Sequence, residues 1–160
     1  MNFIEPAPLH TAPLLRDLSF ASKAHWGYAP EIMGNWRSGY QDPTLAAFEE
    51  ERVQALKEEG DELILGYYAL SALRGDEVSL THLFLRPSHI GKGLGHELLV
   101  AAMVQAKTMG GATLKIVSDP HAERFYTQHG AICTGAVTYQ HNPDYASPVL
   151  ELRLENLQLE

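Results

Sequence analysis

The stretch LFLRPSHIGKGLGHELL (residues 83–99) joins a strand-like apolar run to a helical one through a glycine-rich turn. Gly91, Gly93 and Gly95 alternate with other residues, and Pro87 ends the preceding run because proline cannot donate a ladder hydrogen bond. A strand that turns in this way into a helix points successive backbone N–H groups into one concavity, and the helix N-terminus adds about half a positive charge. The stretch therefore predicts an anion site suited to a phosphate group.

The spacing of the three glycines does not match the common nucleotide-binding loops. A Walker loop requires G-x-x-x-x-G-K-[ST] and a dinucleotide fingerprint requires G-x-G-x-x-G, whereas this chain has G-x-G-x-G. Taken alone, the turn is equally consistent with a tight helix entry that binds no ligand. The identity of the anion must therefore come from other parts of the sequence.

Outward from this stretch, apolar periodicity divides the chain into strand-like and helix-like segments. Residues 94–109 repeat apolar positions at helical spacing, and residues 62–73 and 78–87 are predicted to form a hairpin. Further strands are predicted at 1–6, 52–60, 112–118, 131–140 and 147–155, and a polar loop is predicted at 141–146. Helices are predicted from Thr11 to about Gly27, after Pro30 and at 119–130. This order predicts the α/β (α+β) class: a central mixed, mostly antiparallel sheet of six to seven strands flanked by about four helices.

The composition is that of a globular protein, with 160 residues, 45% of them hydrophobic and 20% charged, and a net charge of −8. This length suits one domain spanning residues 1–160. The acidic charge argues against nucleic acid as a partner, because proteins that bind it normally present a basic face. No apolar run approaches the ~20 residues of a membrane helix and no secretory signal opens the chain, so we expect no membrane partner.

The cysteine and histidine content bears on redox compartment and on metals. A single cysteine, Cys133, excludes an intrachain disulfide and favours a reducing, cytoplasmic location; it is expected to be a small core residue. HELLV at residues 96–100 lacks the second histidine of H-E-x-x-H, and His121 and His129 are poorly spaced for one helix face. We therefore predict no metal cofactor.

The opening stretch resembles the acetyl-CoA loop of the GNAT superfamily of N-acetyltransferases. In that family a strand and a proline lead to [R/Q]-x-x-G-x-[G/A] and then to a helix. Gly93 and Gly95 stand at the positions of this pattern, and Ile90 occupies the position of the usual arginine or glutamine. The departure removes one side chain but leaves the backbone donors in place.

A second segment, SDPHAERFYTQHGA (residues 118–131), is similar to the motif that follows in the same family, N-x-x-A-x-x-x-Y-x-x-x-G-F. The residues in register are Ala122, Tyr126 and Gly130, and the departures are Asp119 for asparagine and Ala131 for phenylalanine. Both segments and the strand between them occur in the family's order, so the similarity covers about residues 62–139.

The resemblance implies a GNAT-like fold and acetyl-CoA as the co-substrate. The sheet of such a protein separates beside the strand that ends at Leu85, and the pantetheine arm of CoA fills the opening. The residues expected to bind CoA are Phe84, Leu85, Ile90, Gly91, Lys92, Gly93, Leu94, Gly95, His96, Asp119, Ala122 and Glu123.

The resemblance also implies catalytic roles for three residues. The backbone N–H of Leu85 would polarise the thioester carbonyl, Tyr126 would give a proton to the leaving thiolate, and His82 would take the proton of the acceptor amine. Read without the motif, Tyr126 is an ordinary half-buried aromatic residue and His82 a core histidine. Glu77 and Glu31 are alternative bases.

These features predict an N-acetyltransferase that moves an acetyl group directly to an amine, with a small molecule as the favoured acceptor. The alternatives are a noncatalytic acyl-CoA-binding module, a protein N-terminal or lysine acetyltransferase, and a domain whose loop binds nothing. A homodimer is compatible with this resemblance. The expected walls of the acceptor pocket are Trp26, Tyr28, Trp36 and Tyr139.

Overall fold

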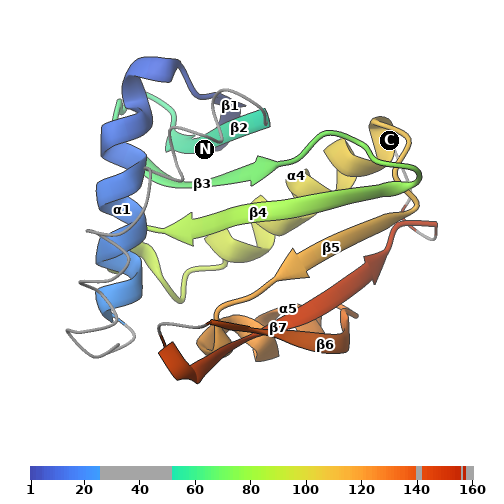
Figure 1. Cartoon of the computed structure of the whole chain (residues 1–160). Coiled ribbons are helices and arrows are strands. Elements are labelled where there is room, and N and C mark those ends of the chain that lie inside the picture. The colour runs from blue at the N-terminus through green and yellow to red at the C-terminus, as the bar shows by residue number, and fades with distance from the viewer. Residues whose placement is uncertain (26–51, 140–141, 156, 158–160) are drawn as a thin grey trace.

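The computed structural model describes residues 1–25, 52–139, 142–155 and 157. Within these residues seven strands form one sheet in the order β1-β2-β3-β4-β5-β7-β6. Neighbouring strands run antiparallel except β4 and β5, which are parallel (Figure 1). The predicted mixed, mostly antiparallel sheet is therefore confirmed. The strands are β1 (Asn2–Pro6), β2 (Arg52–Glu58), β3 (Ile64–Leu70), β4 (Glu77–Leu85), β5 (Thr113–Val117), β6 (Ile132–Tyr139) and β7 (Asn142–Arg153).

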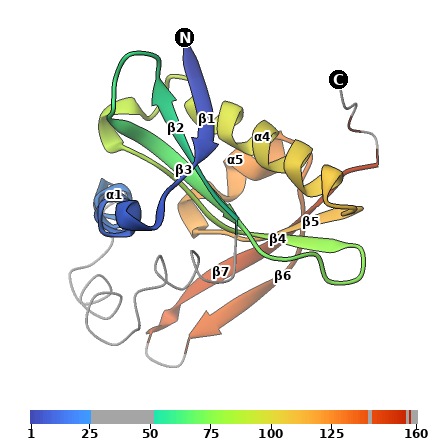
Figure 2. The same cartoon turned by 90° about the horizontal axis from the view of Figure 1, so that it is seen from above.

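Three α-helices lie in the described part of the chain, and short 3₁₀ turns lead into or connect several elements. The helices are α1 (Ala12–His25), α4 (Leu94–Thr108) and α5 (Glu123–Gln128), and the 3₁₀ turns cover Leu9–Thr11, Pro87–His89 and Pro120–Ala122. Figure 2 shows α1 on one side of the sheet and α4 and α5 on the other. Of the four predicted helices, the one after Pro30 lies outside the described residues.

The two faces of the sheet carry separate apolar clusters. Helix α4 buries one stripe of side chains completely, namely Leu98, Leu99, Ala102 and Ala106. On the opposite face, Leu15 and Leu18 of α1 pack with Tyr67 of β3. The helical periodicity read from residues 94–109 is thus confirmed as a buried stripe.

Two adjacent tyrosines on β3 hold these helices through hydrogen bonds. Successive strand residues point to opposite faces, so Tyr67 faces α1 and Tyr68 faces α4. The Tyr67 hydroxyl lies 2.5 Å from Ser19 Oγ, and the Tyr68 hydroxyl donates to Gln105 Oε1 at 2.5 Å. Both hydroxyls are therefore satisfied inside the protein.

Two expectations about the C-terminal strands were wrong. Strand β7 begins at Asn142, so most of the predicted loop at 141–146 has strand backbone. Cys133 is exposed instead of buried, because β6 is the outermost strand and its residues 132–138 are exposed. A sequence that alternates weakly does not reveal which strand lies at the edge of a sheet.

The central constraint on the fold is the pairing of β4. Its ladder with β5 runs from Glu77 opposite Thr113 to Leu80 opposite Ile116 and then stops. Strand β4 continues through Leu85 with β3 as its partner. The sheet therefore opens on one side of β4, as the resemblance implied.

Replacing Gly66 by alanine should destabilise the protein by about 1–3 kcal/mol, because β3 passes very close to β4 and α4 there. A Cβ at Gly66 would lie 2.7 Å from the Phe84 carbonyl oxygen and 3.0 Å from Leu98 Cδ1. Urea unfolding measures the loss. Gly135→Ala is the matched control, since no atom lies within 4 Å of its added Cβ, and it should change stability by less than about 1 kcal/mol. Equal stability of the two variants would contradict this packing argument.

Candidate active site

Beyond the end of its ladder with β5, strand β4 has a backbone donor that β5 does not pair. Arg86 N–H donates to the Leu65 carbonyl across to β3 at 2.7 Å. Because successive N–H groups of an antiparallel strand point to opposite edges, the N–H of Leu85 points away from β3, toward the β5 side. The ladder to β5 has already ended at Leu80, five residues earlier. A polar group entering the opening can therefore accept a hydrogen bond from Leu85.

The glycine-rich turn follows directly and forms a second set of donors. Gly91 and Gly93 have φ values of +85° and +80°, and nothing lies within 4 Å of a Cβ added to either residue. Gly93 is the N-cap of α4 and provides no side-chain cap. The first intrahelical bond runs from Glu97 N–H to Gly93 O, so the preceding N–H groups of α4 remain available to an anion. Around them, Ile90 is half-buried and Lys92 and His96 are exposed.

Three segments of the predicted site meet at Gly95. A Cβ there would lie 3.3 Å from the Phe125 ring of α5 and 3.6 Å from Leu85 Cδ1 of β4. His96 Nδ1 also lies 2.9 Å from His129 Nε2, which joins the start of α4 to the end of α5. The glycine turn, the end of β4 and α5 are therefore packed into one unit.

Tyr126, next to Phe125, points into the core with its hydroxyl group buried. Its side chain is 5% exposed, and among the described residues its hydroxyl has no hydrogen-bond partner. Burial, and secondarily the negative charge of Asp119, raise the pKa of Tyr126. The phenol therefore stays protonated at neutral pH and can donate a hydrogen bond to a group placed beside it.

Asp119, which was predicted to bind CoA, lies between the end of β5 and the 3₁₀ turn Pro120–Ala122. The side chain makes no cap hydrogen bond; instead its Oδ1 lies 3.3 Å from Lys23 Nζ of α1. Lys23 Nζ also lies 5.6 Å from the centroid of the Phe84 ring. Lys23 is not among the residues predicted from the sequence, because helical spacing does not reveal a contact made 96 residues away. Ala122 and Glu123, which follow Asp119, are half-buried.

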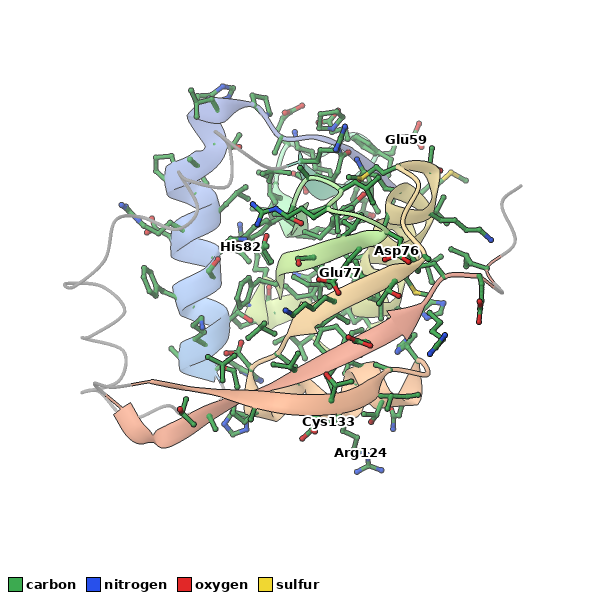
Figure 3. All side chains as sticks on the ribbon, turned by 45° about the vertical axis from the view of Figure 1, so that its right-hand side comes forward. Glu59, Asp76, Glu77, His82, Arg124 and Cys133 are labelled. Carbon is green, nitrogen blue, oxygen red and sulfur yellow. The ribbon has the colours of Figure 1, made fainter. Side chains whose placement is uncertain are left out.

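His82 lies on the α1 side of β4, beside aromatic rings. Its ring centroid is 5.9 Å from that of Tyr67 and 6.3 Å from that of Phe84, and its Nδ1 lies 3.1 Å from Thr81 Oγ1. Figure 3 shows His82 near α1 and Glu77 toward the other end of the strand. Glu77 begins β4, about 26 Å from Leu85 at about 3.3 Å per residue, so the alternative base Glu77 does not belong to this site.

The expected acceptor-pocket residues fall mostly outside the described part of the chain. Trp26, Tyr28 and Trp36 lie there, as does the alternative base Glu31, and Tyr139 is the last residue of β6. No three His, Cys, Asp or Glu side chains in the described ranges are grouped to hold a metal ion. No described helix is both long and apolar enough to cross a membrane.

The sequence matches the family model of the acetyltransferase (GNAT) domain over residues 34–145, more than half of the chain. The chain belongs to the GNAT acetyltransferase family. It is therefore an acyltransferase of a family whose enzymes use acetyl-CoA, as the two sequence motifs implied. No curated protein sequence matches the chain.

Solved structures share the fold at low sequence identity. The PaiA N-acetyltransferase of Thermoplasma acidophilum, in complex with coenzyme A, aligns with a TM-score of 0.76 at 17% identity, covering 96% of this chain and 99% of that one. The ribosomal-protein-S18-alanine N-acetyltransferase of Escherichia coli aligns with a TM-score of 0.71 at 18% identity, covering 99% of this chain and 100% of that one. An aminoglycoside 6′-N-acetyltransferase complexed with coenzyme A aligns with a TM-score of 0.71 at 14% identity, covering 98% of this chain and 99% of that one. This likeness concerns the fold.

The residues present in this GNAT protein fit acetyl-CoA. Backbone N–H groups at the start of α4 suit a pyrophosphate, since neutral donors avoid the desolvation cost of a charged partner. The buried hydroxyl of Tyr126 lacks a partner among the described residues, which suits a sulfur acceptor beside it. The open edge of β4 leaves the N–H of Leu85 for a carbonyl oxygen.

Tyr126 should not ionise at about pH 10, where an ordinary tyrosine is half ionised. Burial disfavours the phenolate, so native wild-type protein and Tyr126→Phe should show the same tyrosinate absorbance at that pH. In denaturant the wild type should gain the signal of one additional tyrosinate. A native-state difference as large as the denatured one would contradict the raised pKa.

Proposed function

We propose that this GNAT protein transfers an acetyl group from acetyl-CoA directly to the amine of a small molecule, as one domain. The observation that carries the proposal is the end of the β4–β5 ladder at Leu80, with Leu85 N–H directed to the side that faced β5 and Tyr126 buried nearby in α5. Bound acetyl-CoA supplies an activated carbonyl and a thiolate leaving group. The chain supplies a donor for the carbonyl oxygen, a base and an acid.

The Leu85 N–H donates a hydrogen bond to the thioester carbonyl oxygen and stabilises the negative charge that develops there. One oriented donor of this kind contributes roughly 2.7–4 kcal/mol in comparable oxyanion sites. Because the donor is backbone, its position depends on the Arg86–Leu65 hydrogen bond and not on the side chain at position 85.

His82 acts as the base for the acceptor amine, and Tyr126 acts as the acid for the leaving sulfur. An acceptor amine with a pKa of about 10.4 is mostly protonated at neutral pH, and His82 removes its proton directly or through water. Tyr126 gives its phenolic proton to the sulfur, which leaves more easily as a thiol than as a thiolate. Burial keeps Tyr126 protonated until that step.

The glycine turn binds the pyrophosphate through backbone N–H groups, and Lys92 adds a point charge. The side chain of Ile90 has no donor, so this chain lacks the charged or amide side chain of the family pattern at that position, and the Ile90 N–H donates to the Pro87 carbonyl. Phe84 and Leu85 line the pantetheine arm on one side of the opening. Asp119, Ala122 and Glu123 line it on the other side.

A small cationic amine is favoured as acceptor by the net charge of −8 and by the absence of an extended acidic tract that would bind a basic peptide. Structural relatives include an enzyme named for an aminoglycoside and one named for a ribosomal protein.

We further place the enzyme in the cytoplasm, because a chain with a single cysteine suits a reducing compartment.

Acetyl-CoA should stabilise the protein by about 2.7 kcal/mol at 100 times its Kd, because only the folded state offers the turn and the opening. Thermal unfolding with and without ligand measures the shift. Desulfo-CoA tests whether the turn binds without the thioester. An unchanged Tm at millimolar acetyl-CoA would refute both the enzyme and the acyl-CoA-binding alternative.

Tyr126→Phe should lower kcat about 100-fold while leaving acetyl-CoA affinity within about twofold, because a general acid contributes about 10²–10⁴ in rate. Release of free thiol is followed across a panel of small amines, with a basic peptide as the protein-like acceptor. Turnover of the peptide alone would favour a protein acetyltransferase. Acetyl-CoA binding with no turnover on any amine would favour the noncatalytic module, and equal kcat in the two proteins would remove Tyr126 from the mechanism.

A further inference from the structure

Strand β4 contains a β-bulge directly beside the proposed base. Its register against β3 pairs Leu80 with Leu70 and His82 with Ala69, so Thr81 is the extra residue of the bulge. In a regular strand, neighbouring side chains point to opposite faces, as expected for Thr81 and His82. The bulge relaxes that alternation and brings Thr81 Oγ1 within 3.1 Å of His82 Nδ1.

The hydrogen bonds of the Thr81 hydroxyl indicate which nitrogen of His82 carries the hydrogen. Thr81 Oγ1 donates to the Ala69 carbonyl oxygen at 3.2 Å, and a carbonyl can only accept. A hydroxyl has one hydrogen, so toward the imidazole Thr81 Oγ1 acts as acceptor. The Nδ1 of His82 must then carry the hydrogen, and in the neutral ring Nε2 keeps the lone pair.

We propose that Thr81 is a positioning residue that holds His82 as the Nδ1–H tautomer and so leaves Nε2 as the basic nitrogen. The catalytic part of this inference rests on the base role given to His82 under the proposed function. The rings of Tyr67 and Phe84 flank the imidazole at 5.9 Å and 6.3 Å and limit its reorientation. Thr81 thus acts through His82 and does not touch the substrate.

The direct test is the tautomer of His82, read by ¹H–¹⁵N correlation of ¹⁵N-labelled histidine rings at about pH 8, where an ordinary histidine is neutral. His82→Gln identifies the signal among the eight histidines. We expect a protonated Nδ1 and an unprotonated Nε2 in the wild type. Thr81→Val keeps the side-chain shape without the hydroxyl and should give a mixture of tautomers, whereas Thr81→Ser should recover Nδ1–H.

Activity provides the second measurement. Thr81→Val should lower kcat about tenfold and leave the KM for acetyl-CoA within about twofold. This loss is smaller than that expected for removing a general base, because His82 itself remains. Thr81→Ser should recover most of the lost kcat. Thr134→Val is the matched control, because Thr134 is also the extra residue of a bulge and donates to a strand carbonyl, that of Val149, far from His82. It should change neither kcat nor the His82 signal.

The outcomes separate this inference from the proposed function. A wild-type His82 that carries its hydrogen on Nε2, or a Thr81→Val protein that keeps Nδ1–H, would overturn the role of Thr81. If His82→Gln retains the wild-type kcat, the base role falls whatever the tautomer is. If His82→Gln is inactive and Thr81→Val has the wild-type kcat, His82 keeps its role as the base and the positioning role of Thr81 is refuted.

Discussion

The one-sided pairing of β4 is the constraint on which the candidate site depends. The strand keeps β3 as its partner to Leu85 but loses β5 after Leu80. An unpaired backbone edge inside a protein is costly unless something else accepts its hydrogen bonds. Here the part of β4 beyond its ladder with β5 faces the place where the family's co-substrate is expected, and the hydrogen bond from Arg86 to Leu65 fixes the direction of the Leu85 N–H. In the proposed mechanism, the group that polarises the carbonyl is therefore a backbone N–H placed by strand pairing and not a reactive side chain.

The glycine turn extends the same reliance on backbone groups. Gly93 begins α4 in a left-handed conformation, and Gly95 allows Phe125 of α5 to approach the helix start. Glycine is required at these two positions for different reasons. At position 93 the backbone φ is positive, and at position 95 a side chain would crowd the Phe125 ring. Neither depends on a charged residue, which explains how Ile90 can stand at a position where the family usually has arginine or glutamine. The fold keeps the donors even when the side chain is lost.

Two polar contacts beside the candidate site depend on the tertiary structure, one between distant residues and one between neighbours in the chain. Lys23 of α1 contacts Asp119 after β5, and the bulge at Thr81 places a hydroxyl beside His82. The first contact joins α1 to the segment after β5, and the second is the one to which we assign the positioning of His82. The contact of Lys23 depends on how α1 packs on the sheet, and the contact of Thr81 depends on the bulge in the β3–β4 ladder. The polar geometry of the site is thus a product of the sheet.

The sequence by itself determined the family, the order of the elements from β3 to α5, and the glycine turn, because these follow from local periodicity, from proline and from glycine spacing. It also identified Leu85 and Tyr126 as candidates through their motifs. Only the tertiary structure decided that β4 loses its partner after Leu80, that Glu77 is remote from the site and that Cys133 is exposed. Those properties depend on strand order, register and edges, and these arise from contacts between residues far apart in the chain, which local patterns do not encode.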